Sequence, residues 1–324
     1  MVIVTGGAGF IGSHLVQGLN RHGVDDIIII DEIDQPHKMS NLSGCHFQEV
    51  IPIAKFPDLL HKDKFGKAIT AIFHQGAITD TLDSDVARFM ACNCDYSRKL
   101  LTHAVRRRIP FIYASSAAVY GAGPVFSEDP ANETPLNCYG LSKLYFDRTV
   151  RNILPTADST VVGLRYFNVY GGNEQHKGGM ASMVFQTGWQ LQQQGRVHLF
   201  KGTDGVPDGE QRRDFVYVED VVDVNLFVAG NDRKLGIYNV GTGRTHSFNE
   251  VAGVWTSLLG AGETKYVTMP EHIRKTYQNF TQADLTKLRR AGYTKDFVCL
   301  EDGIANLYGD WRRSSRAEPE AAST

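Results

Sequence analysis

Residues 2–12 read Val-Ile-Val-Thr-Gly-Gly-Ala-Gly-Phe-Ile-Gly, a short apolar run followed by a glycine-rich turn. Gly6, Gly9 and Gly12 have G-x-x-G-x-x-G spacing, and the next residues, 13–20, predict a helix. Glycine permits the positive φ of a tight turn and lets the backbone approach a pyrophosphate. The helix N-terminus then offers free N–H groups and positive partial charge to an anion. Alone, such a turn is weak evidence, because ordinary loops also contain glycine.

The following strand strengthens the case for a dinucleotide. Four isoleucines, residues 27–30, stand between Asp26 and Asp31, as expected of a strand that is covered on both faces. Asp31 ends this strand nineteen residues after Gly12, where dinucleotide-binding folds carry an acid for the ribose 2′-OH. Asp31 favours NAD, whereas Lys38 is able to offset a 2′-phosphate. The residues thus predict a dinucleotide and leave NAD and NADP open.

The order of apolar runs predicts the fold class. Runs at 2–5, 27–30, 71–74, 111–114 and 161–164 alternate with helix-like segments, which is typical of a parallel sheet. After Gly171 the chain becomes rich in Gly and Gln, and apolar runs return over 214–240. We therefore predict an α/β fold, a doubly wound parallel (Rossmann) sheet with a smaller C-terminal α/β substrate lobe. The predicted domains are 1–170 for the dinucleotide, with a return near 214–245, then 171–312 mainly for substrate, and 313–324 as a flexible tail.

Composition excludes several classes of function. A formal net charge of −2 gives no bulk attraction for nucleic acid or anionic membranes. No apolar stretch approaches the roughly eighteen residues of a membrane span, and no signal-peptide pattern opens the chain, so we expect a cytoplasmic protein. The five cysteines are odd in number and lack the paired spacing of metal or redox sites. We expect reduced thiols and no metal ion.

Tyr139 and Lys143 form the main catalytic candidate. Their i, i+4 spacing stacks the phenol and the ammonium on one helix face. Because a nearby cation favours the phenolate, we expect a lowered tyrosine pKa and proton transfer near neutral pH. Ser116 follows the predicted strand 111–114, at the end of the sheet where ligands bind in open α/β folds. Its hydroxyl is able to hydrogen-bond a sugar hydroxyl or carbonyl.

The glycine turn, Ser116 and the Tyr139/Lys143 pair, in this chain order, resemble the extended short-chain dehydrogenase/reductase family. Residues 165–171, Arg-Tyr-Phe-Asn-Val-Tyr-Gly, resemble its next segment, although Gly172 stands where a proline is common. The resemblance implies that Tyr139 is the acid/base, that Lys143 binds the nicotinamide ribose, and that Ser116 holds the reacting oxygen. It also implies a set of cofactor contacts: Gly6, Gly9, Phe10, Ile11, Gly12, Asp31, Glu32, Lys38, Gln75, Gly76, Ala77, Ile78, Thr79, Asn93, Lys143, Val169 and Lys177.

Residues 171–182, Gly-Gly-Asn-Glu-Gln-His-Lys-Gly-Gly-Met-Ala-Ser, narrow the resemblance. With the segments 200–203, 212–218 and 277–285, they resemble the ADP-glyceromanno-heptose 6-epimerases. That family implies oxidation of the C6 carbinol by NADP⁺, rotation of the transient aldehyde and return of the hydride to its other face. Lys177 becomes a second catalytic proton-transfer residue. The implied substrate contacts are Ser116, Asn168, Gly179, Ser182, Gln186, Phe200, Lys201, Gly202, Thr203, Arg213 and Tyr277.

The sequence departs from the pattern of that family at two positions. Gln186 stands where a histidine is common, and Gly179 where a serine is common. NADP rests mainly on Lys38, with Lys55 a second candidate near the 2′-phosphate. The resemblance implies an ADP-heptose substrate, a homo-oligomer, a pentamer, and a role in supplying heptose for the lipopolysaccharide core.

Three other functions are alternatives to the one that the resemblance implies. A 4,6-dehydratase shares the fold, but the acids of that branch are replaced here by Ala117 and Ala118. A UDP-hexose 4-epimerase, or another nucleotide-sugar member of the family, is the enzyme alternative. A dinucleotide-sensing protein without activity is the non-enzyme alternative, although such proteins usually lack the Tyr or the Lys that this chain keeps.

Overall fold

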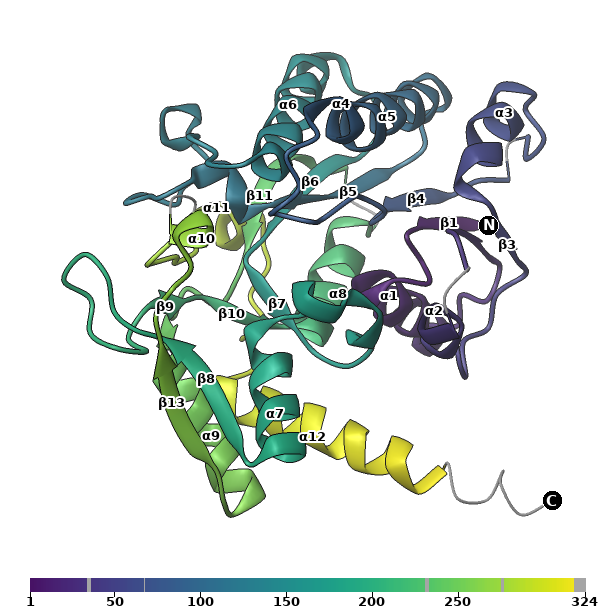
Figure 1. Cartoon of the computed structure of the whole chain (residues 1–324). Coiled ribbons are helices and arrows are strands. Elements are labelled where there is room, and N and C mark those ends of the chain that lie inside the picture. The colour runs from purple at the N-terminus through teal and green to yellow at the C-terminus, as the bar shows by residue number, and fades with distance from the viewer. Residues whose placement is uncertain (34–35, 67, 231–232, 275–276, 318–324) are drawn as a thin grey trace.

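The computed structural model describes residues 1–33, 36–66, 68–230, 233–274 and 277–317. In these ranges seven parallel strands form the main sheet, in the order β11-β6-β5-β4-β1-β2-β3 (Figure 1). The order runs outward from β1 on both sides, so the crevice at the carboxyl ends of β1 and β4 is the switch point where ligands bind in such sheets. The strands are β1 (Val2–Thr5), β2 (Ile27–Ile30), β3 (Glu49–Ile51), β4 (Ala71–His74), β5 (Phe111–Ser116), β6 (Val161–Tyr166) and β11 (Leu235–Val240).

The predicted doubly wound sheet is confirmed, and each of the five predicted strands begins at the expected residue. β5 and β6 each run two residues further than predicted, because Ser115 and Ser116 pair with Arg165 and Tyr166 in the ladder. Backbone pairing continues there although the side chains are polar. The extension matters for function, since it makes Ser116 the last residue of a strand.

Both faces of the sheet are covered, as the isoleucine run of β2 predicts. Ile27 and Ile29 lie in the core under one layer of helices, and Ile28 and Ile30 lie in the core under the other. The first layer contains α1 (Phe10–Arg21), α8 (Val218–Val228) and α11 (Thr286–Arg290), and the second contains α3 (Phe56–His61), α5 (Tyr96–Arg107) and α6 (Cys138–Ile153). The short α4 (Val86–Phe89) packs against α6. A π-helical segment, Met90–Asp95, joins α4 to α5, and the short α2 (Pro36–Ser40) lies beside α1 (Figure 1).

A smaller lobe packs below the sheet around its own core (Figure 1). Trp255 is fully buried there, and its ring stacks on Trp311 at 5.0 Å. The lobe contains α7 (Met183–Gln194), β8 (Arg196–Phe200), α9 (Phe248–Leu259) and β13 (Glu263–Val267). Short pairs and turns connect it to the sheet: β7 (Asn168–Tyr170) with β10 (Phe215–Tyr217), β9 (Arg212–Arg213) with β12 (His246–Ser247), and α10 (Glu271–Arg274). Between these parts α8 and β11 return the chain to the sheet.

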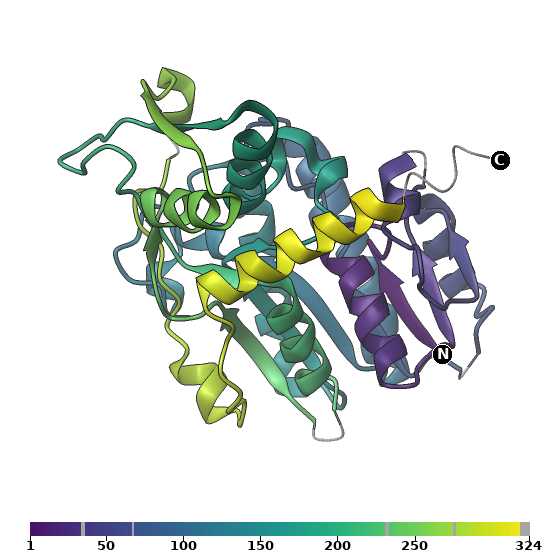
Figure 2. The same ribbon diagram turned by 90° about the horizontal axis from the view of Figure 1, so that it is seen from below.

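The last helix, α12 (Leu300–Ala317), extends from the lobe towards α1 (Figure 2). Residues 313–317, predicted as the start of a flexible tail, are therefore helical. The reason is that Trp311 is held by Phe185 and Trp255, which anchors the turn before them. The rest of the predicted tail, 318–324, lies outside the described residues. None of the helices in the described ranges is long and apolar enough to span a bilayer.

His74 joins three elements beneath the site. Its Nδ1 lies 2.6 Å from the Thr5 hydroxyl on β1, and its Nε2 lies 2.7 Å from the Ser97 hydroxyl on α5. The Ser97 hydroxyl donates to the carbonyl of Asn93, so it accepts from Nε2–H, and Nδ1 accepts from Thr5. This pattern suits a neutral imidazole. Burial, with Lys143 nearby, lowers the pKa of His74 from 6.5 to about 3.

We expect His74 to make the fold acid-sensitive. The unfolded chain binds a proton near pH 6.5 and the folded chain only near pH 3, so stability from this group falls as pH drops below 6.5. At about 1.4 kcal/mol per pH unit, the loss by pH 5 is about 2 kcal/mol. Urea unfolding at pH 7.5 and pH 5.0 should show a smaller pH dependence in His74→Asn than in the wild type. The exposed His61→Asn serves as control, and equal pH dependence in all three proteins would contradict the assignment.

Candidate active site

A cleft of about 1060 Å³ lies at the carboxyl ends of the strands, with walls from the sheet and from the segment leading into the lobe. All four residues predicted to be catalytic, Ser116, Tyr139, Lys143 and Lys177, line it. They come from β5, α6 and the 3₁₀ segment η6 (Gln175–Met180), which are far apart in sequence. The predicted residues that also line the cleft are Gly6, Gly9, Phe10, Ile11, Gly12, Asp31, Lys38, Gln75, Gly76, Ala77, Ile78, Thr79, Asn168, Val169 and Ser182.

The glycine turn forms one wall and has the shape that a pyrophosphate needs. Gly6 has φ +68°, and a Cβ on Gly12 would lie 2.0 Å from the carbonyl oxygen of Gly6. Helix α1 starts after Gly9 without a side-chain cap and without an acid in its first turn. The N-terminal N–H groups and the helix dipole are therefore available to an anion. These features fit a dinucleotide at this edge.

Asp31 and Lys38 lie together beyond this turn. The Asp31 carboxylate accepts from the Ala8 N–H at 2.9 Å and pairs with the Lys38 ammonium at 2.8 Å. Both residues line the cleft, so an anionic and a cationic side chain stand side by side there. Glu32 instead accepts from the Ile53 N–H at 2.9 Å and is not among the cleft-lining residues. Lys55 is exposed outside the cleft lining.

Asn93 supports the loop after β4 from behind. Its side chain accepts from the Ile78 N–H and donates to the Ile78 carbonyl, each at 2.9 Å, and it donates to the Ser142 hydroxyl at 3.0 Å. Asn93 is buried in the π-helical segment and does not line the cleft. It therefore shapes the loop 75–79 rather than forming part of the wall. π-helical turns are often found at functional sites.

The Tyr139, Lys143 and Ser116 group is assembled at the end of β5. The Lys143 ammonium donates to the Ala114 carbonyl at 2.8 Å and lies 5.9 Å from the centre of the Tyr139 ring. Burial lowers the pKa of Lys143 to about 8, with Asp147 and Cys94 acting against this shift. Burial also raises the pKa of Tyr139, while a hydrogen bond from Ser116 lowers it. The lowered tyrosine pKa predicted from the Tyr/Lys spacing is therefore wrong in direction, because burial outweighs the nearby groups.

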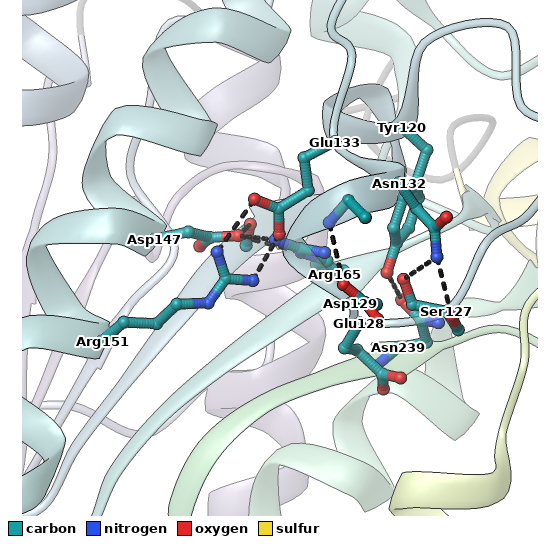
Figure 3. Close-up of polar contacts among 12 residues, drawn as sticks. Tyr120, Ser127, Glu128, Asp129, Asn132, Glu133, Asp147, Arg151, Arg165 and Asn239 are labelled. Carbon is teal, nitrogen blue, oxygen red and sulfur yellow. Dashed lines mark hydrogen bonds and ion pairs between the residues drawn. The ribbon is translucent and has the colours of Figure 1, made fainter.

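Asp147, one turn after Lys143, fastens this helix to the sheet. It accepts from the Tyr113 hydroxyl at 2.8 Å, from the Ser115 hydroxyl at 3.0 Å and from the Arg165 guanidinium at 2.8 and 2.9 Å. Arg165 also pairs with Glu133, which binds Arg151 (Figure 3). The Asp147, Glu133 and Arg165 side chains are fully buried. The polar network therefore connects α6, β5 and β6 directly behind the cleft.

The segment that carries Lys177 is docked on the glycine turn. Asn41 donates to the Ala8 carbonyl at 3.0 Å and lies 3.2 Å from Nδ1 of His176. Asn173 donates to the Ser13 hydroxyl at 3.0 Å. Through these contacts the residues before Lys177 rest on the same turn that forms the first wall of the cleft.

The lobe residues that were predicted to contact the substrate form a second group beside the cleft. The Arg213 guanidinium lies 5.0 Å from the Tyr277 ring centre and 5.7 Å from that of Phe248. Burial lowers the pKa of Arg213, while Tyr277 raises it. Phe200 packs edge-on to Tyr277 at 5.9 Å, and Asn168 joins the group to the cleft by donating its N–H to the Asp214 carbonyl. The turn of Lys201, Gly202 and Thr203 follows Phe200, and none of these lobe residues except Asn168 lines the cleft.

Gln186 and Gly179, the two positions at which the sequence departs from the family pattern, contact each other. The Gln186 side chain donates to the Gly179 carbonyl at 3.0 Å and to the Ala181 carbonyl at 2.6 Å. Neither residue is among those lining the cleft. Gln186 thus holds the backbone of the segment before α7.

Several residues of the site were missed from the sequence. Tyr96 lines the cleft with a buried hydroxyl that has no hydrogen-bond partner, and Cys92, Arg88 and Ile53 also line it. The sequence does contain a signal for Asp147, because it lies eight residues after Tyr139 and therefore on the helix face shared by Tyr139 and Lys143. The signal for Glu174 is weaker, because it consists only of an i, i+3 spacing to Lys177.

The sheet, the glycine turn and the Tyr139/Lys143 pair define a Rossmann-fold protein of the short-chain dehydrogenase/reductase class. More particularly, the chain belongs to the NAD dependent epimerase/dehydratase family, which matches residues 2–241. The resemblance inferred from the motifs is confirmed.

Individual proteins agree with this assignment. The ADP-L-glycero-D-manno-heptose-6-epimerase of Alkalilimnicola ehrlichii is 49% identical over 306 residues, covering 94% of this chain and 96% of its own. A crystal structure of the Helicobacter pylori enzyme of the same name has a TM-score of 0.84 at 33% identity and covers 96% of each chain. The UDP-glucose 4-epimerase of Thermus thermophilus in complex with NAD has a TM-score of 0.76 at 25% identity, over 96% of this chain and 98% of its own.

We predict that Gly12→Ala greatly weakens dinucleotide binding, because its Cβ would collide with the Gly6 carbonyl and distort the turn. We expect a loss of at least about tenfold in affinity, equal to about 1.4 kcal/mol. Isothermal titration with NADP⁺ and NAD⁺ measures it. Gly253→Ala is the matched control, since nothing lies within 4 Å of the Cβ position there. Unchanged affinity in Gly12→Ala would show that the turn does not hold the cofactor.

Proposed function

We propose that the protein is an isomerase that converts ADP-D-glycero-D-manno-heptose to ADP-L-glycero-D-manno-heptose with a tightly bound NADP. The observation that carries this proposal is that two side chains able to transfer protons, Tyr139 on α6 and Lys177 on η6, line one cleft. An epimerase that oxidises and reduces the same carbon needs acid/base help in two orientations of the carbonyl. The names of the A. ehrlichii and H. pylori relatives support the choice of substrate.

The proposal gives a role to five residues in and beside the cleft. A bound NADP⁺ would supply the hydride acceptor, and its reduced form would supply the hydride donor for the opposite face of the carbonyl. Tyr139 exchanges the proton of the C6 oxygen in one orientation, and Lys177 does so in the other. Ser116 holds that oxygen, and Lys143 binds the nicotinamide ribose. Arg213, whose planar guanidinium suits phosphate oxygens, binds the diphosphate of the substrate beside Tyr277.

The alternatives differ in what they require of the cleft. A dehydratase needs acids after β5, and the chain has Ala117 and Ala118 in the 3₁₀ turn η3 (Ala117–Tyr120) there. A UDP-hexose 4-epimerase has the same fold, as the T. thermophilus protein illustrates, but that alternative gives Lys177 no part in proton transfer. The second proton-transfer residue therefore separates the proposal from its main rival. The homo-oligomer, the pentamer, the cytoplasmic location and the supply of heptose to lipopolysaccharide stay predictions.

We expect Tyr139→Phe to retain the cofactor, and we expect both Tyr139→Phe and Lys177→Met to lose turnover by about 10²- to 10⁴-fold, the usual contribution of a positioned acid or base. NMR of the C6 epimers, with ADP-heptose and UDP-glucose supplied in parallel, measures turnover and substrate choice. Tyr145→Phe, an exposed tyrosine on the same helix, and Lys265→Met, an exposed lysine on β13, are the matched controls.

Three outcomes would contradict the assignment. Turnover of UDP-glucose without turnover of ADP-heptose would favour the 4-epimerase. Full activity of Lys177→Met would remove the second proton-transfer residue. No turnover of any nucleotide sugar by a dinucleotide-loaded protein would favour the sensing alternative.

Lys38 should decide the preference for NADP. A 2′-phosphate beside the Lys38 ammonium would gain a charge-assisted hydrogen bond, which contributes about 1.5–3 kcal/mol. Lys38→Ala should therefore weaken NADP⁺ binding by about 10- to 100-fold and leave NAD⁺ binding nearly unchanged. The exposed Lys55→Ala is the control. Equal weakening of both cofactors, or none, would mean that Lys38 does not read the 2′-phosphate.

A further inference from the structure

Glu174 is a fully buried carboxylate behind the cleft-lining residues Lys177 and Ser182, outside every set of residues described above as reacting or binding. Its side chain has no solvent exposure, and it lies three residues before Lys177. A buried carboxylate is unfavourable unless it is paired or hydrogen-bonded, so its partners indicate what it does.

The partners of Glu174 are Lys177 itself and the two residues at the ends of the segment 171–182, Gly171 and Ser182. One oxygen accepts from the Gly171 N–H at 3.2 Å and from the Ser182 hydroxyl at 2.7 Å. The other oxygen accepts from the Ser182 N–H at 2.6 Å and faces the Lys177 ammonium at 3.4 Å. The carboxylate therefore closes residues 171–182 into a loop and presents negative charge to the lysine at its centre.

Lys177 also contacts an aromatic ring. Its ammonium lies 5.0 Å from the centre of the ring of Phe10, the first residue of α1, which itself lines the cleft. A cation between a carboxylate and an aromatic face has few other positions. The side chain remains about 23% exposed, so it is held at the wall without being closed off from the cleft.

We propose that Glu174 is a positioning residue that holds the Lys177 ammonium at the wall of the cleft for proton transfer to the substrate. This inference rests on the proposed function, in which Lys177 is the second proton-transfer residue. Glu174 acts through Lys177 and through the loop, and it makes no contact with the reacting carbon. Its removal should therefore lower kcat and leave KM and cofactor retention near the wild-type values.

A double-mutant cycle in the NMR assay tests the inference. We expect Glu174→Gln to lower kcat by about 10- to 100-fold, a typical effect of disturbing the position of a catalytic group. If Glu174 acts through Lys177, adding Glu174→Gln to Lys177→Met causes no further loss. The matched control is Glu263→Gln, which removes an exposed carboxylate that pairs with Lys265 on β13, outside the cleft lining. It should keep kcat within a few-fold of the wild type.

The outcomes separate the two proposals. If Lys177→Met turns over normally, the proposed role of Lys177 fails. If Lys177→Met is impaired, the inference on Glu174 fails alone in either of two cases. In the first, Glu174→Gln has wild-type kcat. In the second, Glu174→Gln lowers kcat by the same factor in the Lys177→Met background as in the wild-type protein. Should Glu174→Gln not fold, Glu174→Asp keeps the charge but withdraws it by one methylene. It must then show a reduced kcat at unchanged KM, and wild-type kcat would overturn the inference.

Discussion

The buried pair of Asp147 and Arg165 is the constraint on which the site depends. Asp147 lies on α6 in register with Tyr139 and Lys143, and its carboxylate is held by side chains from β5 and β6. Both charges are fully buried, so removing Arg165 would leave the Asp147 carboxylate without its ion-pair partner, at a cost of about 3–5 kcal/mol. Such a pair is a weak source of net stability. Its consequence is geometric, since it fixes the catalytic helix against the strand that ends at Ser116.

The rest of the cleft is built on a second fixed point, the glycine turn. Asp31 and Asn41 bind the Ala8 backbone from two sides, and Asn41 also contacts the Lys177 segment through His176. The glycine turn and Lys177, the proposed second proton-transfer residue, therefore share one support. Glu174 and Phe10 both contact the Lys177 ammonium. The two proposed proton-transfer groups, which lie on unrelated elements, are thus held by separate polar networks around one cavity.

Much of this arrangement could be predicted from local patterns. The glycine spacing, the isoleucine strand and the Tyr139/Lys143 spacing are short-range signals, because a turn, a strand and a helix each impose their own period on the sequence. Lys177 was found only through resemblance to a family. Glu174 and Asn41 were not found, since each acts on partners whose proximity depends on how the loop folds over the turn. The direction of the Tyr139 pKa was wrong because spacing shows a neighbouring charge and does not show burial.

The sequence by itself determined the class of fold and the dinucleotide edge, because backbone conformation and hydrophobic period are encoded within a few residues. It also carried the family resemblance that narrows the chemistry. Only the tertiary structure decided which predicted residues meet in one cleft, that Asn93 and Gln186 support loops from behind, and that Arg213 joins Tyr277 in the lobe. The physical reason is that hydrogen bonding, burial and charge pairing depend on distances between segments more than a hundred residues apart, such as Asn41 and His176.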